Sequence, residues 1–121
     1  MPKKILVVDD DRDLVDIIQA LLEKNGYEVM TANDGAKALE MIKTQVPDLM
    51  IVDLTMPVLG GWHFTAKVRQ DPRYQTTPII VLSGLLEGDS DAEKFEFASA
   101  YMVKPFDIFK LLDKIKKFLN P

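Results

Sequence analysis

Short runs of aliphatic residues alternate along this chain with longer segments that have the periodicity of a helix. The clearest runs are ILVV at residues 5–8, LMIV at 49–52 and IIVL at 79–82. Unbroken runs of this kind are typical of strands that are covered on both faces, as in a parallel sheet. Weaker runs at 27–32 and 100–103 complete a set of five predicted strands.

The segments between these runs are predicted to be helices, because their apolar residues recur three and four positions apart. The predicted helices are a first one that stops at Asn25-Gly26, one over 34–43, one between Gly60-Gly61 and Asp71-Pro72, one from Asp89 or Ser90 to Ala98, and one over 107–119. Five strand-helix units are too few for a barrel, which needs eight. The sequence therefore predicts an α/β fold in which helices cover both faces of an open, doubly wound parallel sheet.

Two of the predicted helices have a clear apolar face. The residues at helical spacing in the first helix are Leu14, Ile17, Ile18, Leu21 and Leu22. Those in the last helix are Ile108, Leu111, Leu112, Ile115, Phe118 and Leu119. The last helix also gathers lysines at 110, 114, 116 and 117 toward its carboxyl end, where the helix dipole favours positive charge. These lysines are interpreted as a solvated face, with a docking face for an acidic partner as the alternative.

Composition excludes several classes of protein. With 121 residues, 47% of them hydrophobic, residues 1–121 are predicted to form a single domain. The net charge of −4 argues against direct binding to nucleic acid or to anionic lipid. There is no cysteine, which excludes disulfides and thiolate metal sites. The apolar run near the amino end is too short for a signal sequence or a membrane span, so a cytoplasmic protein without membrane insertion is expected.

Polar and charged residues follow four of the five predicted strands. They are Asp9-Asp10-Asp11, Asp53, Ser83-Gly84 and Lys104-Pro105. In open parallel sheets, ligands bind at the carboxyl ends of the strands, so these side chains are expected to converge. Carboxylates that lie close together need a cation to stay ionised, and an all-oxygen ligand set favours Mg²⁺ over other metals. A cation held in this way suggests phosphoryl chemistry.

Four motifs in this arrangement resemble the receiver domain of two-component response regulators, most of all the stand-alone, single-domain chemotaxis regulators. The motifs are VVDD at 7–10, VDLTMP at 52–57 followed by GG at 60–61, LSG at 82–84, and YMVKPF at 101–106. They span essentially the whole chain in the family's order. The resemblance implies the flavodoxin-like (βα)5 receiver fold, with a five-stranded parallel sheet of strand order 2-1-3-4-5.

The resemblance also implies an aspartyl-phosphate site. Asp53 takes the position of the phosphoacceptor, to which a histidine kinase passes its phosphoryl group. Asp10 and Asp53 would ligate Mg²⁺ directly, together with the backbone carbonyl of Thr55, and Asp9 would act through a water molecule. The implied domain catalyses only its own phosphorylation and dephosphorylation, so it is not an enzyme in the classical sense.

A conformational switch is implied by the same resemblance. Lys104 would pair with the phosphoryl oxygens, Ser83 would move to hydrogen-bond one of them, and Tyr101 would change rotamer with it. The implied partners are a sensor histidine kinase or a histidine phosphotransfer protein on the input side, and a downstream target protein that reads the switched conformation.

Some residues near these motifs have simpler interpretations. Asp11 is predicted to be a helix amino-cap, and His63 an exposed helix residue without a role in phosphotransfer. The chain departs from the family pattern at Leu85, and at Phe97-Ala98 where the family usually has Gly-Ala. Because an apolar Leu85 cannot orient an attacking water, a long phosphoryl lifetime is expected.

Three other classes share part of this pattern. A haloacid-dehalogenase-like phosphohydrolase needs a second aspartate two residues after the nucleophile, where this chain has Thr55. A flavodoxin-like nucleotide or flavin binder needs a phosphate-binding loop after the first strand, where three aspartates would repel phosphate. A receiver-like interaction module that works without phosphorylation stays open as the alternative, although such modules usually lose an acid or the lysine.

Overall fold

The computed structural model describes residues 2–54, 61–84 and 98–120, apart from the side chain of Trp62. The strands are β1 (Lys4–Val8), β2 (Glu28–Ala32), β3 (Leu49–Asp53), β4 (Ile79–Ser83) and β5 (Ala100–Val103). The helices are α1 (Arg12–Lys24), α2 (Gly35–Met41), α3 (Gly61–Gln70), the short 3₁₀ helix η1 (Pro72–Tyr74) and α4 (Ile108–Leu119). The helix predicted between 89 and 98 lies almost entirely outside the described residues.

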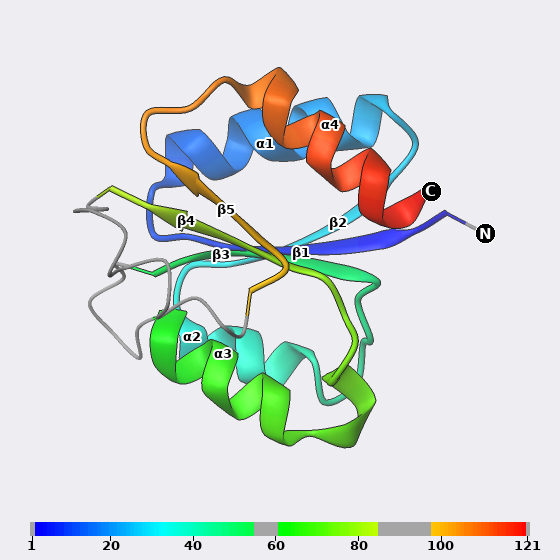
Figure 1. Cartoon of the computed structure of the whole chain (residues 1–121), viewed down its shortest axis with the longest axis vertical. Helices are drawn as coiled ribbons and strands as arrows, with labels where there is room; N and C mark the ends of the chain where they lie inside the picture. The colour runs from blue at the N-terminus through cyan, green and yellow to red at the C-terminus, as the bar shows by residue number, and fades with distance from the viewer. Residues whose placement is uncertain (1, 55–60, 85–97, 121) are drawn as a thin grey trace.

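The five strands form one parallel sheet in the order β2-β1-β3-β4-β5. Figure 1 shows that α1 and α4 cover one face of this sheet, whereas α2 and α3 cover the other. The predicted doubly wound α/β fold and its strand order are therefore confirmed. All four aliphatic positions of the predicted run at 5–8 are buried, as the two covering layers require.

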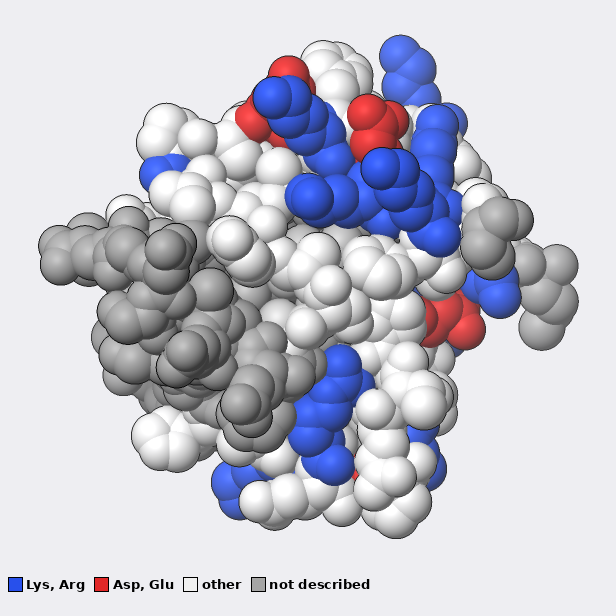
Figure 2. Space-filling model, viewed as in Figure 1, with Lys and Arg blue, Asp and Glu red and all other residues white. Residues whose placement is uncertain are grey.

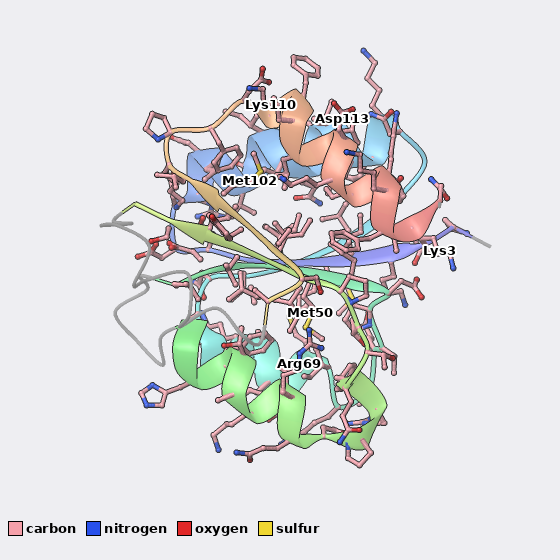
Figure 3. The ribbon with its side chains drawn as sticks, viewed as in Figure 1. Lys3, Met50, Arg69, Met102, Lys110 and Asp113 are labelled. Carbon is pink, nitrogen blue, oxygen red and sulfur yellow. The ribbon has the colours of Figure 1, made fainter. Side chains whose placement is uncertain are left out.

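Two hydrophobic cores lie on the two faces of the sheet. Alternate residues of each strand point to opposite faces, so one strand contributes to both cores. Figure 3 shows Met50 on the side of α2 and α3, and Met102 on the side of α1 and α4. Phe64 and Val68 of α3 are completely buried or nearly so in the first core. The sheet is thus held rigidly between both layers, which fixes the positions of its strand ends.

Local sequence determines where the helices begin. The Asp11 side chain accepts a hydrogen bond from the amide of Leu14, so Asp11 is the amino-cap of α1 as predicted. Asp34 and Asp107 cap α2 and α4 in the same way. At the other end of α1, Asn25 is the C-cap and Gly26 has a φ of 89°, a left-handed conformation that suits glycine.

Two residues of the predicted apolar faces are not buried. Ile17 of α1 is 56% exposed and Phe118 of α4 is 37% exposed. Consecutive residues of a helix are rotated by about 100°, so the burial of Ile18 turns its neighbour Ile17 toward solvent. Phe118 lies three residues after the buried Ile115, at the border of that face and in the last turn of α4. The apolar face of each helix is therefore narrower than its sequence pattern indicates.

Candidate active site

The carboxyl ends of β1 and β3 bring two carboxylates together. Val8 and Val52 are partners in the sheet register, so Asp9 and Asp53 follow directly on adjacent strands. The Asp9 amide still donates to the Ala32 carbonyl at 3.1 Å, which extends the pairing of β1 with β2 by one residue. Asp9 is 1% exposed and Asp53 is 2% exposed. β3 therefore ends on a buried carboxylate, that of Asp53.

Asp10 completes a group of three acids at this edge of the sheet. One carboxylate oxygen from each of Asp9, Asp10 and Asp53 lies within 4.8 Å of the others. Asp10 is exposed, whereas the other two are buried. A depression of about 670 Å³ between α1 and α2 adjoins Asp9 and Asp10, so the site opens to solvent on this side. Three convergent carboxylates are a set of hard oxygen ligands that could hold a divalent metal ion.

Lys104 places a positive charge between the two buried acids. Its ammonium nitrogen lies 2.9 Å from Asp9 Oδ2 and 3.3 Å from Asp53 Oδ2, so it donates to both carboxylates. The Lys104 amide donates to the Ser83 carbonyl at 2.7 Å, which anchors the lysine just after β5 and beside β4. The Lys104-Pro105 peptide bond that follows is cis. Residues 9, 53 and 104 thus meet although they are far apart in the sequence.

The surroundings of this cluster change its acid-base properties. Burial raises the pKa of Asp9 from its usual 3.8 to about 6, and the charge of Asp53 adds to this rise. The Asp11 amide and the Lys104 ammonium, which both donate to Asp9, act in the opposite direction. Burial alone would lower the pKa of Lys104, but its hydrogen bonds and attraction to Asp9 and Asp53 outweigh burial, so this pKa is raised. Lys104 therefore stays positively charged at neutral pH.

The remaining predicted site residues lie in different surroundings. Ser83 is buried at the end of β4, the strand that pairs directly with β3. Tyr101 of β5 is 46% exposed. Thr55 lies outside the described residues, as do Leu85 and Phe97. His63 is an exposed residue of α3, as predicted.

Two features of the site were not predicted from the sequence. One is the direct ion pair between Lys104 and Asp9, which joins residues at opposite ends of the chain. The other is the close approach of Gly61, at the start of α3, to the backbone of Asp53. The GG pair at 60–61 was a signal for the second feature, since a glycine at a helix start can mark such a contact. For the first, the sequence indicated that both residues lie at the same edge of the sheet, but not that they contact each other.

Comparison with known proteins agrees with this arrangement. The sequence model of the family described as "Response regulator receiver domain" matches residues 5–116. The chain belongs to the response regulator receiver family. It is 38% identical over 121 residues to the alkaline phosphatase synthesis transcriptional regulatory protein PhoP of Bacillus subtilis, covering 99% of this chain and 50% of that protein. It is 27% identical over 121 residues to the polar-differentiation response regulator DivK of Brucella anthropi, covering 99% of this chain and 98% of that one.

Solved receiver structures have the same fold. The chemotaxis response regulator CheY4 of Vibrio cholerae superposes with a TM-score of 0.90 at 33% identity, covering 98% of this chain and 100% of that one. The response regulator TrrA of Thermotoga maritima, in complex with Mg²⁺ and BeF, superposes with a TM-score of 0.84 at 33% identity, covering 97% and 99% of the two chains. This receiver chain spans about half the length of several curated relatives it matches, including PhoP. None of its described helices is long and apolar enough to cross a membrane.

Proposed function

We propose that Asp53 of this receiver domain accepts a phosphoryl group from a histidine kinase or a histidine phosphotransfer protein, and that a target protein reads the resulting change. Receiver domains of two-component systems work by phosphorylation. The observation that carries the assignment to Asp53 is its burial beside two further carboxylates and a lysine at the carboxyl edge of the sheet. We further propose that residues 1–121 act as one receiver domain in the cytoplasm.

The reaction uses Asp53 as a nucleophile. A carboxylate oxygen of Asp53 attacks the phosphorus of phosphohistidine, a new O–P bond forms, and the N–P bond breaks as the imidazole leaves and takes up a proton from solvent. Lys104 is already within 3.3 Å of Asp53, so its ammonium can neutralise charge that develops on the phosphoryl oxygens. The site transfers this group only to itself, and its later hydrolysis returns the domain to its starting state.

The acids of this site fit a magnesium ion. Asp9, Asp10 and Asp53 offer only oxygen ligands, and the exposure of Asp10 leaves room for the water molecules that Mg²⁺ usually keeps. Asp10 and Asp53 would bind the ion directly with the Thr55 carbonyl, and Asp9 would bind through water. Bound Mg²⁺ would supply Lewis-acid stabilisation of the phosphoryl oxygens.

The conformational output is assigned to Ser83 and Tyr101. Ser83 lies on β4 next to the strand that carries Asp53, so its hydroxyl is well placed to follow a phosphoryl group on that residue. Tyr101 lies on β5, paired with Val81 of β4, and its ring is exposed enough to change rotamer without unpacking the core. Phosphorylation would shift the population between two packings of this edge, and the target protein would bind one of them in preference.

The test is the intact mass of the protein after incubation with acetyl phosphate, with and without Mg²⁺. The wild type is expected to gain the mass of one phosphoryl group only when Mg²⁺ is present, and Asp53→Asn is expected to gain none. A folded wild type that binds Mg²⁺ but gains no mass would contradict the proposal and favour an interaction module that works without phosphorylation.

A further inference from the structure

The start of α3 lies against the backbone of the proposed phosphoacceptor. A Cβ atom built on Gly61 would lie 2.3 Å from the Asp53 carbonyl oxygen and 2.7 Å from Leu54 Cα. Real Cβ atoms essentially never approach other atoms this closely. Both contacts are with backbone atoms, which cannot rotate away as the end of a side chain can. Only glycine therefore permits the observed distance between α3 and the end of β3.

Neither α3 nor the end of β3 can move away from this contact without loss of packing or of strand pairing. On the helix side, Phe64 and Val68 are 0% and 1% exposed in the core beneath the sheet, so a shift of α3 would unpack them. On the strand side, Asp53 is in register with Leu82, and the Leu54 amide donates to the Leu82 carbonyl at 2.9 Å. On the β1 side, Val52 is in register with Val8, so Asp53 directly continues the part of β3 that is paired with β1.

From this geometry we infer that Gly61 is a positioning residue. It lets the first turn of α3 hold the backbone of Asp53 at the position, relative to Asp9 and Lys104, that phosphoryl transfer needs. The inference rests on the proposed role of Asp53 and adds a residue that touches neither metal nor phosphoryl group. A side chain at position 61 would displace Asp53 relative to Asp9 and Lys104. Misplacement of a reacting group by about 1 Å can slow a reaction by up to about a hundredfold.

A buried hydrogen bond fixes the backbone of Gly61 in turn. The Thr65 hydroxyl donates to the Gly61 carbonyl at 2.9 Å, and Thr65 is 1% exposed. This bond closes the first turn of α3 from within. Replacement of Thr65 by valine keeps the shape of the side chain and removes this donor, so it loosens the same contact without adding an atom at position 61.

The test compares Gly61→Ala with two other glycine variants. A Cβ atom on Gly84 meets nothing within 4 Å, although Gly84 also lies at the carboxyl edge of the sheet, so Gly84→Ala is the matched control near the site. Gly26 has a φ of 89° and lies at the end of α1, so Gly26→Ala strains the fold away from the site. Three quantities are measured for each variant: the urea midpoint without Mg²⁺, Mg²⁺ affinity by calorimetry, and the rate of phosphorylation by acetyl phosphate at saturating Mg²⁺.

We expect Gly61→Ala to weaken Mg²⁺ binding and to slow phosphorylation at saturating Mg²⁺ by about ten- to a hundredfold. Gly26→Ala is expected to lower the urea midpoint and to leave the phosphorylation rate of the folded protein at the wild-type value. Gly84→Ala is expected to leave the urea midpoint at the wild-type value, because its added methyl group has space. Loss of stability alone therefore cannot produce the pattern expected for Gly61→Ala.

Two results would overturn the inference. One is a Gly61→Ala protein that is phosphorylated as fast as the wild type, and the other is an equal loss of rate in Gly26→Ala. If Gly61→Ala does not fold, Thr65→Val decides: a slower rate with unchanged urea midpoint supports the inference, and a wild-type rate contradicts it. Failure of the proposed function is distinct, because the wild type itself would then gain no phosphoryl group.

Discussion

The two ends of the parallel sheet carry the same kinds of charged side chain in opposite surroundings. At the carboxyl end, Lys104 contacts Asp9 at 2.9 Å, and their side chains are 23% and 0% exposed. At the amino end, Lys4 lies 3.9 Å from Glu28, and these side chains are 31% and 56% exposed. Lys4 begins the same strand that Asp9 follows, so a single strand joins a solvated pair to a buried one.

The difference between the two ion pairs is one of burial, and burial makes the charges at the carboxyl edge depend on their neighbours. Water and salt screen an exposed ion pair, so such pairs contribute only about 0–1 kcal/mol. A buried carboxylate is poorly hydrated and depends on its neighbours for its charge. The raised pKa of Asp9 is the result, and it makes the carboxyl edge sensitive to a lysine, a metal ion or a phosphoryl group. The Lys4–Glu28 pair at the amino edge is instead open to water.

Removal of the lysine from the buried pair is expected to have the largest effect on stability. Lys104→Met keeps an unbranched side chain but leaves Asp9 and Asp53 without their ammonium partner. Loss of one member of a buried pair leaves an uncompensated charge, so we expect the free energy of unfolding without Mg²⁺ at pH 7.5 to fall by about 3 kcal/mol. Urea denaturation measures this change. A loss no greater than that of an exposed pair would refute the distinction between the two edges.

Magnesium is expected to stabilise the carboxyl edge by a slightly smaller amount. A ligand that binds only the folded state at a concentration of about 100 times its Kd adds about 2.7 kcal/mol to the free energy of unfolding. Urea denaturation with Mg²⁺ or with a chelator measures the gain. Asp53→Asn should gain much less, because the variant lacks one of the three carboxylates. An equal gain in wild type and variant would show that the ion binds elsewhere.

Replacement of Asp9 by asparagine is expected to stabilise the protein when Mg²⁺ is absent. In the folded state the pKa of Asp9 is about 6, above its usual 3.8, so folding favours the protonated acid. The wild type therefore loses stability as the pH rises through this window, by up to about 3 kcal/mol at 1.4 kcal/mol for each pH unit. This pKa already includes the attraction of Lys104. Because asparagine does not reproduce every hydrogen bond of the acid, we expect a net gain of about 1–2 kcal/mol at pH 7.5.

The pH dependence provides the control for this prediction. As the pH falls below 3.8, Asp9 becomes protonated in the unfolded as well as the folded state, so the advantage of Asp9→Asn should disappear. The experiment is a series of urea denaturation curves from pH 3.5 to 8 in the presence of a chelator. A difference between wild type and variant that does not change with pH would indicate an effect of shape rather than of charge.

Much of this fold could be predicted from the sequence, because its strands are buried on both faces. The runs at 49–52 and 79–82 are continuous for that reason, and they mark β3 and β4 to within one residue. The helix ends were predictable where local chemistry fixes them, as at Asp11 and Gly26. Burial of individual helix residues such as Ile17 was not, since it depends on the exact rotation of each helix against the sheet.

The sequence predicted which residues form the candidate site, but only partly which of them contact one another. Asp53 and Lys104 follow predicted strands, and the carboxyl ends of parallel strands must share one edge. The ion pair between Lys104 and Asp9 depends instead on the distance between β1 and the end of β5, across two intervening strands. Contacts of this range are set by the twist and packing of the whole sheet, which no local pattern contains.

The exposed pair at the amino edge should give the smallest effect. Lys4→Met keeps the apolar stem of the side chain, and the Lys4 backbone amide retains its 2.8 Å hydrogen bond to Asp48. Only the interaction with Glu28 is lost, so we expect the free energy of unfolding to change by about 0.5 kcal/mol or less. A double-mutant cycle with Glu28→Gln isolates the coupling energy of this pair. A coupling as large as that between Lys104 and Asp9 would mean that position along the strand, rather than burial, distinguishes the two edges.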